Sequence, residues 1–174
     1  MKTGPSLSKL AEDFIYPLNA FARAPAELAT FRSMSVNIAQ LLVRTARLDP
    51  QRPALAQGER MLASYAELAT RVAALAAGMA SRLAANDRVA LVMKNCPQYV
   101  ELMFACWHAG LVVVPINAKL HPKEVEYILA DSGARLCFAS VDLYPVLAAH
   151  ALTGLDELIE VGSSAYAQLG SIGT

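Results

Sequence analysis

The chain has 174 residues, with 15 basic and 15 acidic side chains, so its formal net charge is zero. Because no basic stripe is visible, the sequence argues against nucleic-acid binding. The chain is 55% hydrophobic but lacks an apolar run of about 18 residues, so we expect no membrane span. Only 17% of the residues are charged, where soluble domains usually approach a quarter. This composition predicts either helices that are buried on several sides, or a part of a larger protein whose contact surface is left uncovered.

The three cysteines show neither close pairing nor the spacing of a zinc site. Cys96, Cys106 and Cys137 all fall within apolar runs, which is typical of buried, inert thiols. Cys96 also precedes a predicted helix, where a lowered pKa is an alternative that would make its thiol reactive. The cysteine pattern favours a reducing compartment, and we expect the protein to be cytoplasmic.

The first 33 residues differ from the rest of the chain. An apolar helical face begins at Phe14, but Pro17 and Pro25 interrupt it. We interpret residues 1–33 as an N-terminal leader or extension, and Met34 is an alternative start. Residues 34–174 then form the domain proper.

From residue 36 the predicted elements follow one another regularly. Residues 36–48 repeat apolar side chains at helical spacing, and residues 54–64 predict a hairpin with its turn at Gly58-Glu59. Ser64 and Glu67 form a Ser-x-x-Glu capping box, which predicts the start of a long helix. Its inner face is formed by Leu68, Val72, Leu75, Met79 and Leu83.

Beyond residue 87, strands alternate with helices. The apolar pattern predicts strands at residues 88–93, 111–115, 135–139 and 157–161. The intervening helices are predicted at residues 95–110, 121–132 and 142–150, with Gly133 as a C-terminal cap and the first of them largely buried. Such alternation predicts an α/β fold with a mainly parallel sheet and helices on both faces.

Ligands of parallel α/β sheets bind beyond the carboxyl ends of the strands. Three loops occupy these ends: Lys94-Asn95-Cys96-Pro97, residues 116–121, and Ser140-Val141-Asp142. We interpret Asn95 of the first loop as a helix cap, and the third loop as the cap of the next helix. In the second, Lys119 and His121 either meet a phosphate or form a solvated loop. The sequence contains no glycine-rich phosphate loop, catalytic triad or metal-ligand spacing of its three histidines.

Several stretches in order resemble the adenylate-forming (AMP-binding) superfamily. Ser64-Tyr65-Ala66-Glu67-Leu68 is similar to its first core motif, and "NDRVALVMKNCPQYVELMFACWHAGLVVVPIN" resembles the second with its preceding strand and helix. "HPKEVEYILADSGARLCF" continues the resemblance, which spans roughly residues 36–165. "VVVPIN" favours the acyl-CoA synthetase, or fatty-acid–CoA ligase, branch. At Ala85-Asn86-Asp87-Arg88 relatives usually have glycine before Asp-Arg, so we expect a less tight turn.

The resemblance implies an N-terminal part of the large domain that stops before the family's phosphate loop. The full-length enzyme would use ATP, Mg²⁺ and CoA to convert a small carboxylic acid to acyl-CoA, AMP and pyrophosphate, with a role in fatty acid metabolism. The family's catalytic residues come later, so we expect no catalytic residue, metal or cofactor in this chain and no activity from it alone. The resemblance places Asn117 and Lys119 near the nucleotide end of CoA.

The partner of this chain is left open by the sequence. It is either the remainder of the same domain or a second copy in a homo-oligomer, since the apolar composition predicts self-association. The alternative to an enzyme fragment is a natural short scaffold or interaction module that pairs with another chain. The reading frame beyond Thr174 distinguishes these two classes.

Overall fold

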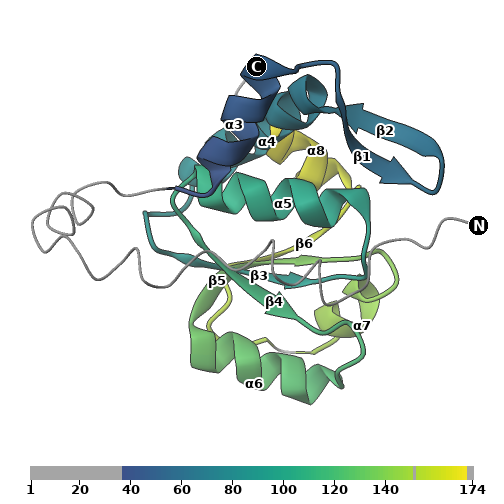
Figure 1. Ribbon diagram of the computed structural model, residues 1–174. Coiled ribbons are helices and arrows are strands. Elements are labelled where there is room, and N and C mark those ends of the chain that lie inside the picture. The colour runs from purple at the N-terminus through teal and green to yellow at the C-terminus, as the bar shows by residue number, and fades with distance from the viewer. Residues whose placement is uncertain (1–36, 151, 172–174) are drawn as a thin grey trace, which may run out of the picture. The chain divides into compact units, whose positions relative to one another are not determined.

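The computed structural model describes residues 37–150 and 152–171 (Figure 1). The predicted leader, residues 1–33, lies outside the described residues. Over this part of the chain, no helix combines the length and the apolar character that crossing a bilayer requires.

A four-stranded parallel sheet forms the centre of the fold. Its strands are β3 (Arg88–Val92), β4 (Val112–Ile116), β5 (Ala134–Ala139) and β6 (Glu157–Glu160), in the order β4-β3-β5-β6. All three neighbouring pairs are parallel, which confirms the predicted sheet. Strand β4 lies at one edge, and Pro115 within it is in register with Leu91 of β3. The chain runs from β3 to β4 on one side and then returns to β5 on the other.

Helices cover both faces of this sheet, as predicted (Figure 1). Helices α4 (Tyr65–Ala80), α5 (Pro97–His108) and α8 (Ser164–Ser171) lie on one face, and α6 (Pro122–Ser132) and α7 (Tyr144–Ala148) lie on the other. Side chains alternate accordingly along each strand. Leu91 and Phe138 pack into the cluster beneath α4, α5 and α8, whereas Ala90 and Cys137 pack into the cluster with α6 and α7.

A helix and a hairpin precede the sheet. Helix α3 (Ala39–Leu48) falls within the predicted residues 36–48, and β1 (Pro53–Gln57) pairs antiparallel with β2 (Arg60–Ser64). Gly58 turns the hairpin with a φ of 60°, a conformation that glycine adopts without steric cost. The predicted capping box is confirmed. The Ser64 N–H donates to Glu67 Oε2 at 2.8 Å, and the Glu67 N–H donates to Ser64 Oγ at 3.3 Å.

Two predicted helix caps are wrong. The N-cap of α5 is Cys96, whose side chain makes no capping hydrogen bond, so Asn95 lies one residue outside the helix. Helix α7 begins only at Tyr144, because the N–H groups of Leu143 and Tyr144 both donate to the Ser140 carbonyl and form a turn first. Ser140 Oγ instead donates to Asp142 Oδ1 at 2.7 Å.

Helix α8 was not predicted from the sequence. It packs against α4 at Gly78, where an added Cβ would lie 2.0 Å from the Leu169 carbonyl oxygen. Glycine at this position therefore allows the two helix backbones to approach closely. Helix α5 is less buried than predicted. Four of its residues are buried, namely Glu101, Leu102, Ala105 and Cys106, whereas most of the others are half-buried and His108 is exposed.

The turn before β3 is tight, contrary to the expectation from its missing glycine. Asn86 adopts a φ of 69°, and asparagine tolerates this left-handed conformation better than most residues. The Asp87 N–H donates to the Ala84 carbonyl at 3.0 Å, and the Ala84 N–H donates to Asp87 Oδ2 at 2.8 Å. The turn is thus closed from both directions.

Charged side chains tie the amino end of the sheet together. Arg135 Nη1 contacts Asp87 Oδ2 at 2.7 Å, and its Nη2 contacts Asp156 Oδ2 at 2.6 Å. Arg88 of β3 donates to the last carbonyls of α6, from Nε to Ser132 at 2.9 Å and from Nη2 to Gly133 at 2.7 Å. These contacts join three strands and one helix terminus.

Candidate functional site

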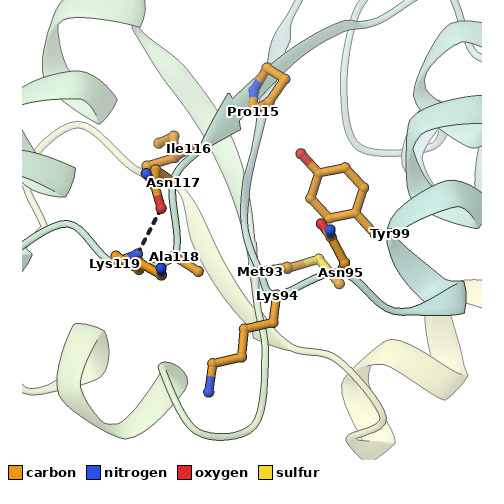
Figure 2. A pocket seen from close by; sticks show the side chains of 9 residues that line it. All are labelled: Met93, Lys94, Asn95, Tyr99, Pro115, Ile116, Asn117, Ala118 and Lys119. Carbon is orange, nitrogen blue, oxygen red and sulfur yellow. Dashed lines mark hydrogen bonds between the residues drawn. The ribbon is translucent and has the colours of Figure 1, made fainter.

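A hollow of about 510 Å³ lies at the carboxyl ends of β3 and β4 (Figure 2). One wall comes from the loop after β3 and the start of α5, and the other comes from the end of β4 and the loop that follows it. Its lining residues are Met93, Lys94, Asn95, Tyr99, Pro115, Ile116, Asn117, Ala118 and Lys119. The hollow occupies the end of the sheet where parallel α/β folds bind ligands.

The loop after β4 is shaped by Asn117. Its Oδ1 accepts a hydrogen bond from the Lys119 N–H at 3.0 Å, and its backbone carbonyl accepts one from Leu120 at 3.1 Å (Figure 2). This side-chain-to-backbone turn leaves the amide nitrogen of Asn117 as a donor. The structure therefore brings the two predicted site residues, Asn117 and Lys119, into one hollow. Lys119 is exposed and forms no ion pair within the described part of the chain.

His121, the other residue considered for phosphate contact, lies outside this lining and caps α6. Its Nδ1 accepts from the Lys123 N–H at 3.3 Å, and its N–H donates to Glu124 Oε2 at 2.8 Å. Histidine thus takes the place that Ser or Thr holds in the usual capping box. The preceding loop is fixed at both ends, by Asn117 and by this cap.

Lys94 contributes a second positive charge to the lining. Its Nζ lies 2.5 Å from Asp142 Oδ2, an oxygen on the loop after β5. Lys94 and then Ser140, through their hydrogen bonds, lower the pKa of Asp142. The residues that line the hollow include two lysines and no carboxylate. Chemically, this arrangement suits an anionic group such as a phosphate.

The sequence selected Lys119 and Asn117 but not Tyr99, which forms part of the opposite wall. Tyr99 lies in the first turn of α5, and its ring faces the hollow (Figure 2). A helical residue three positions after Cys96 has no sequence signal of its own. Only the pairing of β3 with β4 brings it opposite Asn117.

The cysteines do not contribute chemistry to this hollow. Cys106 and Cys137 are buried, and desolvation raises the pKa of each thiol to about 12. Both thiols are therefore protonated and unreactive at neutral pH, as the apolar pattern predicted. Cys96 is a half-buried free thiol outside the lining. No cluster of three metal-ligating side chains occurs in residues 37–150 and 152–171.

A second hollow, of about 420 Å³, lies between α4, α5 and α8. Its lining includes one cation, Arg71, and one carboxylate, Glu101. They form an ion pair in which Arg71 Nη1 contacts Glu101 Oε1 at 3.0 Å, so their charges neutralise each other. Among the described residues, the buried Tyr166 hydroxyl has no hydrogen-bond partner, and burial raises the pKa of Tyr166. This hollow offers a ligand little net charge, so the hollow at the strand ends is the better candidate for binding an anion.

Comparisons with known proteins identify the family of this chain. The sequence profile of the family described as "AMP-binding enzyme" matches residues 42–168, which is well over half of the chain. A feruloyl-CoA synthase from Amycolatopsis sp is 47% identical over 93 residues, covering 53% of this chain and 19% of the relative. A fatty acid–[acyl-carrier-protein] ligase, ScoC from Streptomyces coeruleorubidus, is 35% identical over 130 residues, covering 72% of this chain and 25% of the relative.

Solved structures share the fold. The N-terminal domain of FACL13 from Mycobacterium tuberculosis matches with a TM-score of 0.71 and 27% identity, over 79% of this chain and 36% of that domain. A Mycobacterium tuberculosis fatty acyl CoA synthetase matches with a TM-score of 0.70 and 29% identity, over 78% of this chain and 28% of the other. The chain thus spans a fifth to about a third of the relatives named here. It belongs to the AMP-binding enzyme family, and its fold matches part of the N-terminal domain of such enzymes.

Proposed function

We propose that this chain forms part of an ATP-dependent acid–CoA ligase. The complete enzyme converts a carboxylic acid, ATP and CoA to acyl-CoA, AMP and pyrophosphate, with Mg²⁺ neutralising phosphate charge. The observation that carries the proposal is the family match over residues 42–168, together with relatives whose names include a CoA synthase and a fatty acid ligase. On this proposal the enzyme is cytoplasmic and acts in fatty acid metabolism.

Residues 34–174 supply the first part of the large domain, and residues 1–33 are a leader or extension. The chain alone is catalytically silent, because the phosphate loop and catalytic lysine expected of the family are not among residues 1–174. Adenylation needs donors aimed at the developing charge of the phosphoryl transition state. The two lysines of the strand-end hollow cannot replace such an array.

Within the complete enzyme, the strand-end hollow binds a phosphate at the nucleotide end of CoA. Lys119 supplies the positive charge, and Asn117 holds the loop that carries it. A solvated lysine contact contributes only about 1 kcal/mol. Residues elsewhere in the complete enzyme therefore supply most of the affinity for CoA.

The first test compares this chain with the chain extended through its downstream domains. Acid-dependent exchange of labelled pyrophosphate into ATP should be absent from the short chain and present in the extended one. If the short chain shows more exchange than a control without protein, the proposal that it has no catalytic activity of its own is overturned. If the folded, extended enzyme shows no exchange with any carboxylic acid, the proposal that it is an acid–CoA ligase is overturned.

The second test addresses Lys119 in the extended enzyme. Lys119→Met should raise the KM for CoA about fivefold, as expected for the loss of one solvated ion contact. Pyrophosphate exchange, which precedes CoA binding, should not change. Lys123→Met is the matched control, because Lys123 is exposed on α6 and does not line the hollow. An equal KM for K119M and K123M would refute the CoA contact.

The second candidate function is a scaffold that pairs with another copy or chain. Exposed apolar side chains on and beside α3 favour it, namely Ile38, Leu41 and Leu48. We accordingly expect this chain to self-associate, and sedimentation velocity across a hundredfold range of concentration measures it. A monomer over the whole range would count against the scaffold and leave the ligase proposal intact.

A further inference from the structure

Lys94 lines the strand-end hollow and also forms an ion pair with Asp142, which lies outside the lining. We propose that Lys94 is a second phosphate contact of this hollow, and that Asp142 competes for it and so limits the affinity for phosphorylated ligands. The identity of the ligand, the nucleotide end of CoA, rests on the function proposed above. The competition itself rests on the geometry of three neighbouring loops.

The strand order places these loops side by side. Strand β3 lies between β4 and β5, so the loop after β3 has Lys119 on one side and Asp142 on the other. The side chain of Lys94 points away from Asn117 in the hollow (Figure 2), and its amino group contacts Asp142 at 2.5 Å. Asp142 is held in place by Ser140 Oγ at 2.7 Å. One central lysine therefore has an acid on one side and an anion-binding loop on the other.

The ion pair is weak enough to exchange. The Lys94 and Asp142 side chains are 69% and 42% exposed, and ion pairs in water with this much exposure contribute little free energy. A lysine ammonium group is carried on a flexible four-carbon stem, so rotation redirects it without moving the backbone. A phosphate with close to two negative charges competes well against one carboxylate. Asp142 keeps its hydrogen bond from Ser140 when Lys94 leaves.

The test measures binding of adenosine 3′,5′-bisphosphate, the nucleotide portion of CoA, to the 174-residue chain by NMR titration at fixed ionic strength. Asp142→Asn should tighten binding about two- to fivefold, because Lys94 no longer has a competing acid. Lys94→Met should weaken binding by a similar factor. In the double variant K94M/D142N, the gain from D142N should disappear.

Asp131→Asn controls for net charge. Asp131 is exposed near the end of α6, and its side chain makes no hydrogen bond or ion pair within the described residues, so D131N makes the same chemical change without affecting Lys94. Equal tightening by D131N and D142N would show a general charge effect and overturn the proposal. Equal tightening by D142N with and without Lys94 would show direct repulsion by Asp142 and would also overturn it.

Lys119→Met separates this inference from the function on which it rests. If K119M binds the bisphosphate as the wild type does while K94M and D142N shift affinity as expected, the role of Lys119 is wrong and the competition stands. If K119M weakens binding while D142N has no effect, the CoA contact stands and the competition is wrong. No binding by the wild type or by D142N would overturn the inference for this ligand. A circular dichroism spectrum of each variant verifies its fold.

Discussion

The two ends of the parallel sheet use charged residues in opposite ways. At the amino end, Arg135 and Arg88 contact two carboxylates and two backbone carbonyls, which leaves these cations satisfied. At the carboxyl end, Lys119 is unpaired among the described residues and Lys94 has one exposed partner. The arginines hold elements together, and the lysines are available to an incoming ligand. Residue type alone does not separate these roles, because strand order decides which charges meet.

The largest effect that distinguishes the two ends is expected at Gly133. Gly133→Ala should lower the free energy of unfolding by about 2 kcal/mol, because the residue has a φ of 61° and an added Cβ would lie 2.6 Å from Arg88 Nη2. Arg88 would have to move and lose its contact with the α6 terminus. Urea denaturation measures the change, and Gly154→Ala is a control with positive φ but open space around it. If G133A and G154A lose equal stability, the effect comes from alanine at positive φ alone and not from the contact with Arg88.

The next comparison replaces one positively charged residue at each end of the sheet by methionine. Arg135→Met should lower the urea midpoint, since it leaves Asp87 and Asp156 without their shared partner. Lys94→Met should leave the midpoint unchanged within error, because its pair with Asp142 is solvated. If K94M destabilises the protein as much as R135M does, the ion pair at the carboxyl end also stabilises the fold. The proposed difference between the two ends of the sheet would then be wrong.

A smaller effect is expected in the turn that carries Asp87. Asn86→Ala should cost about 1 kcal/mol, because alanine is strained at a φ of 69°. Asn86→Gly should be neutral within about 0.5 kcal/mol, since glycine adopts this conformation freely. Thermal unfolding of the two variants measures the difference. A stable N86A would mean that the turn does not fix Asp87 for the amino-end contacts.

The smallest effect concerns pH. The Ala84 N–H and then Arg135 lower the pKa of Asp87 below its ordinary value of 3.8. A carboxyl group whose folded pKa is depressed stabilises the protein above its unfolded pKa, and this contribution is lost as the pH falls through the folded pKa. The stability difference between wild type and Asp87→Asn should therefore be constant near neutral pH and shrink below pH 3.8. A difference that grows with acidity would contradict the assignment.

Local sequence signals predicted much of the fold. Continuous apolar runs identified the strands of the sheet, and the capping box at Ser64 located the start of α4. The family resemblance placed Asn117 and Lys119, which the structure brings into one hollow, although their contact with CoA stays a prediction. The ion pairs Lys94–Asp142 and Arg135–Asp87 were not predictable, because each joins residues that are 48 positions apart and that meet only through the order of the strands. Helix α8 was missed because it has only eight residues. Ser163 caps its start by accepting a hydrogen bond from the Tyr166 N–H at 3.2 Å, but no Glu or Gln three residues later completes a capping box.

Pro115 limits how a second molecule can attach to this fold. The residue lies in β4, an edge strand, and proline has no N–H to offer to an added strand. The opposite edge, β6, has only four residues, and two of them are glutamates. Both edges are therefore poor templates for strand addition, the route by which exposed sheets commonly aggregate. A partner of the described fold is accordingly expected to dock through helical side chains, and ordered fibrils are an unfavourable end point for this sheet.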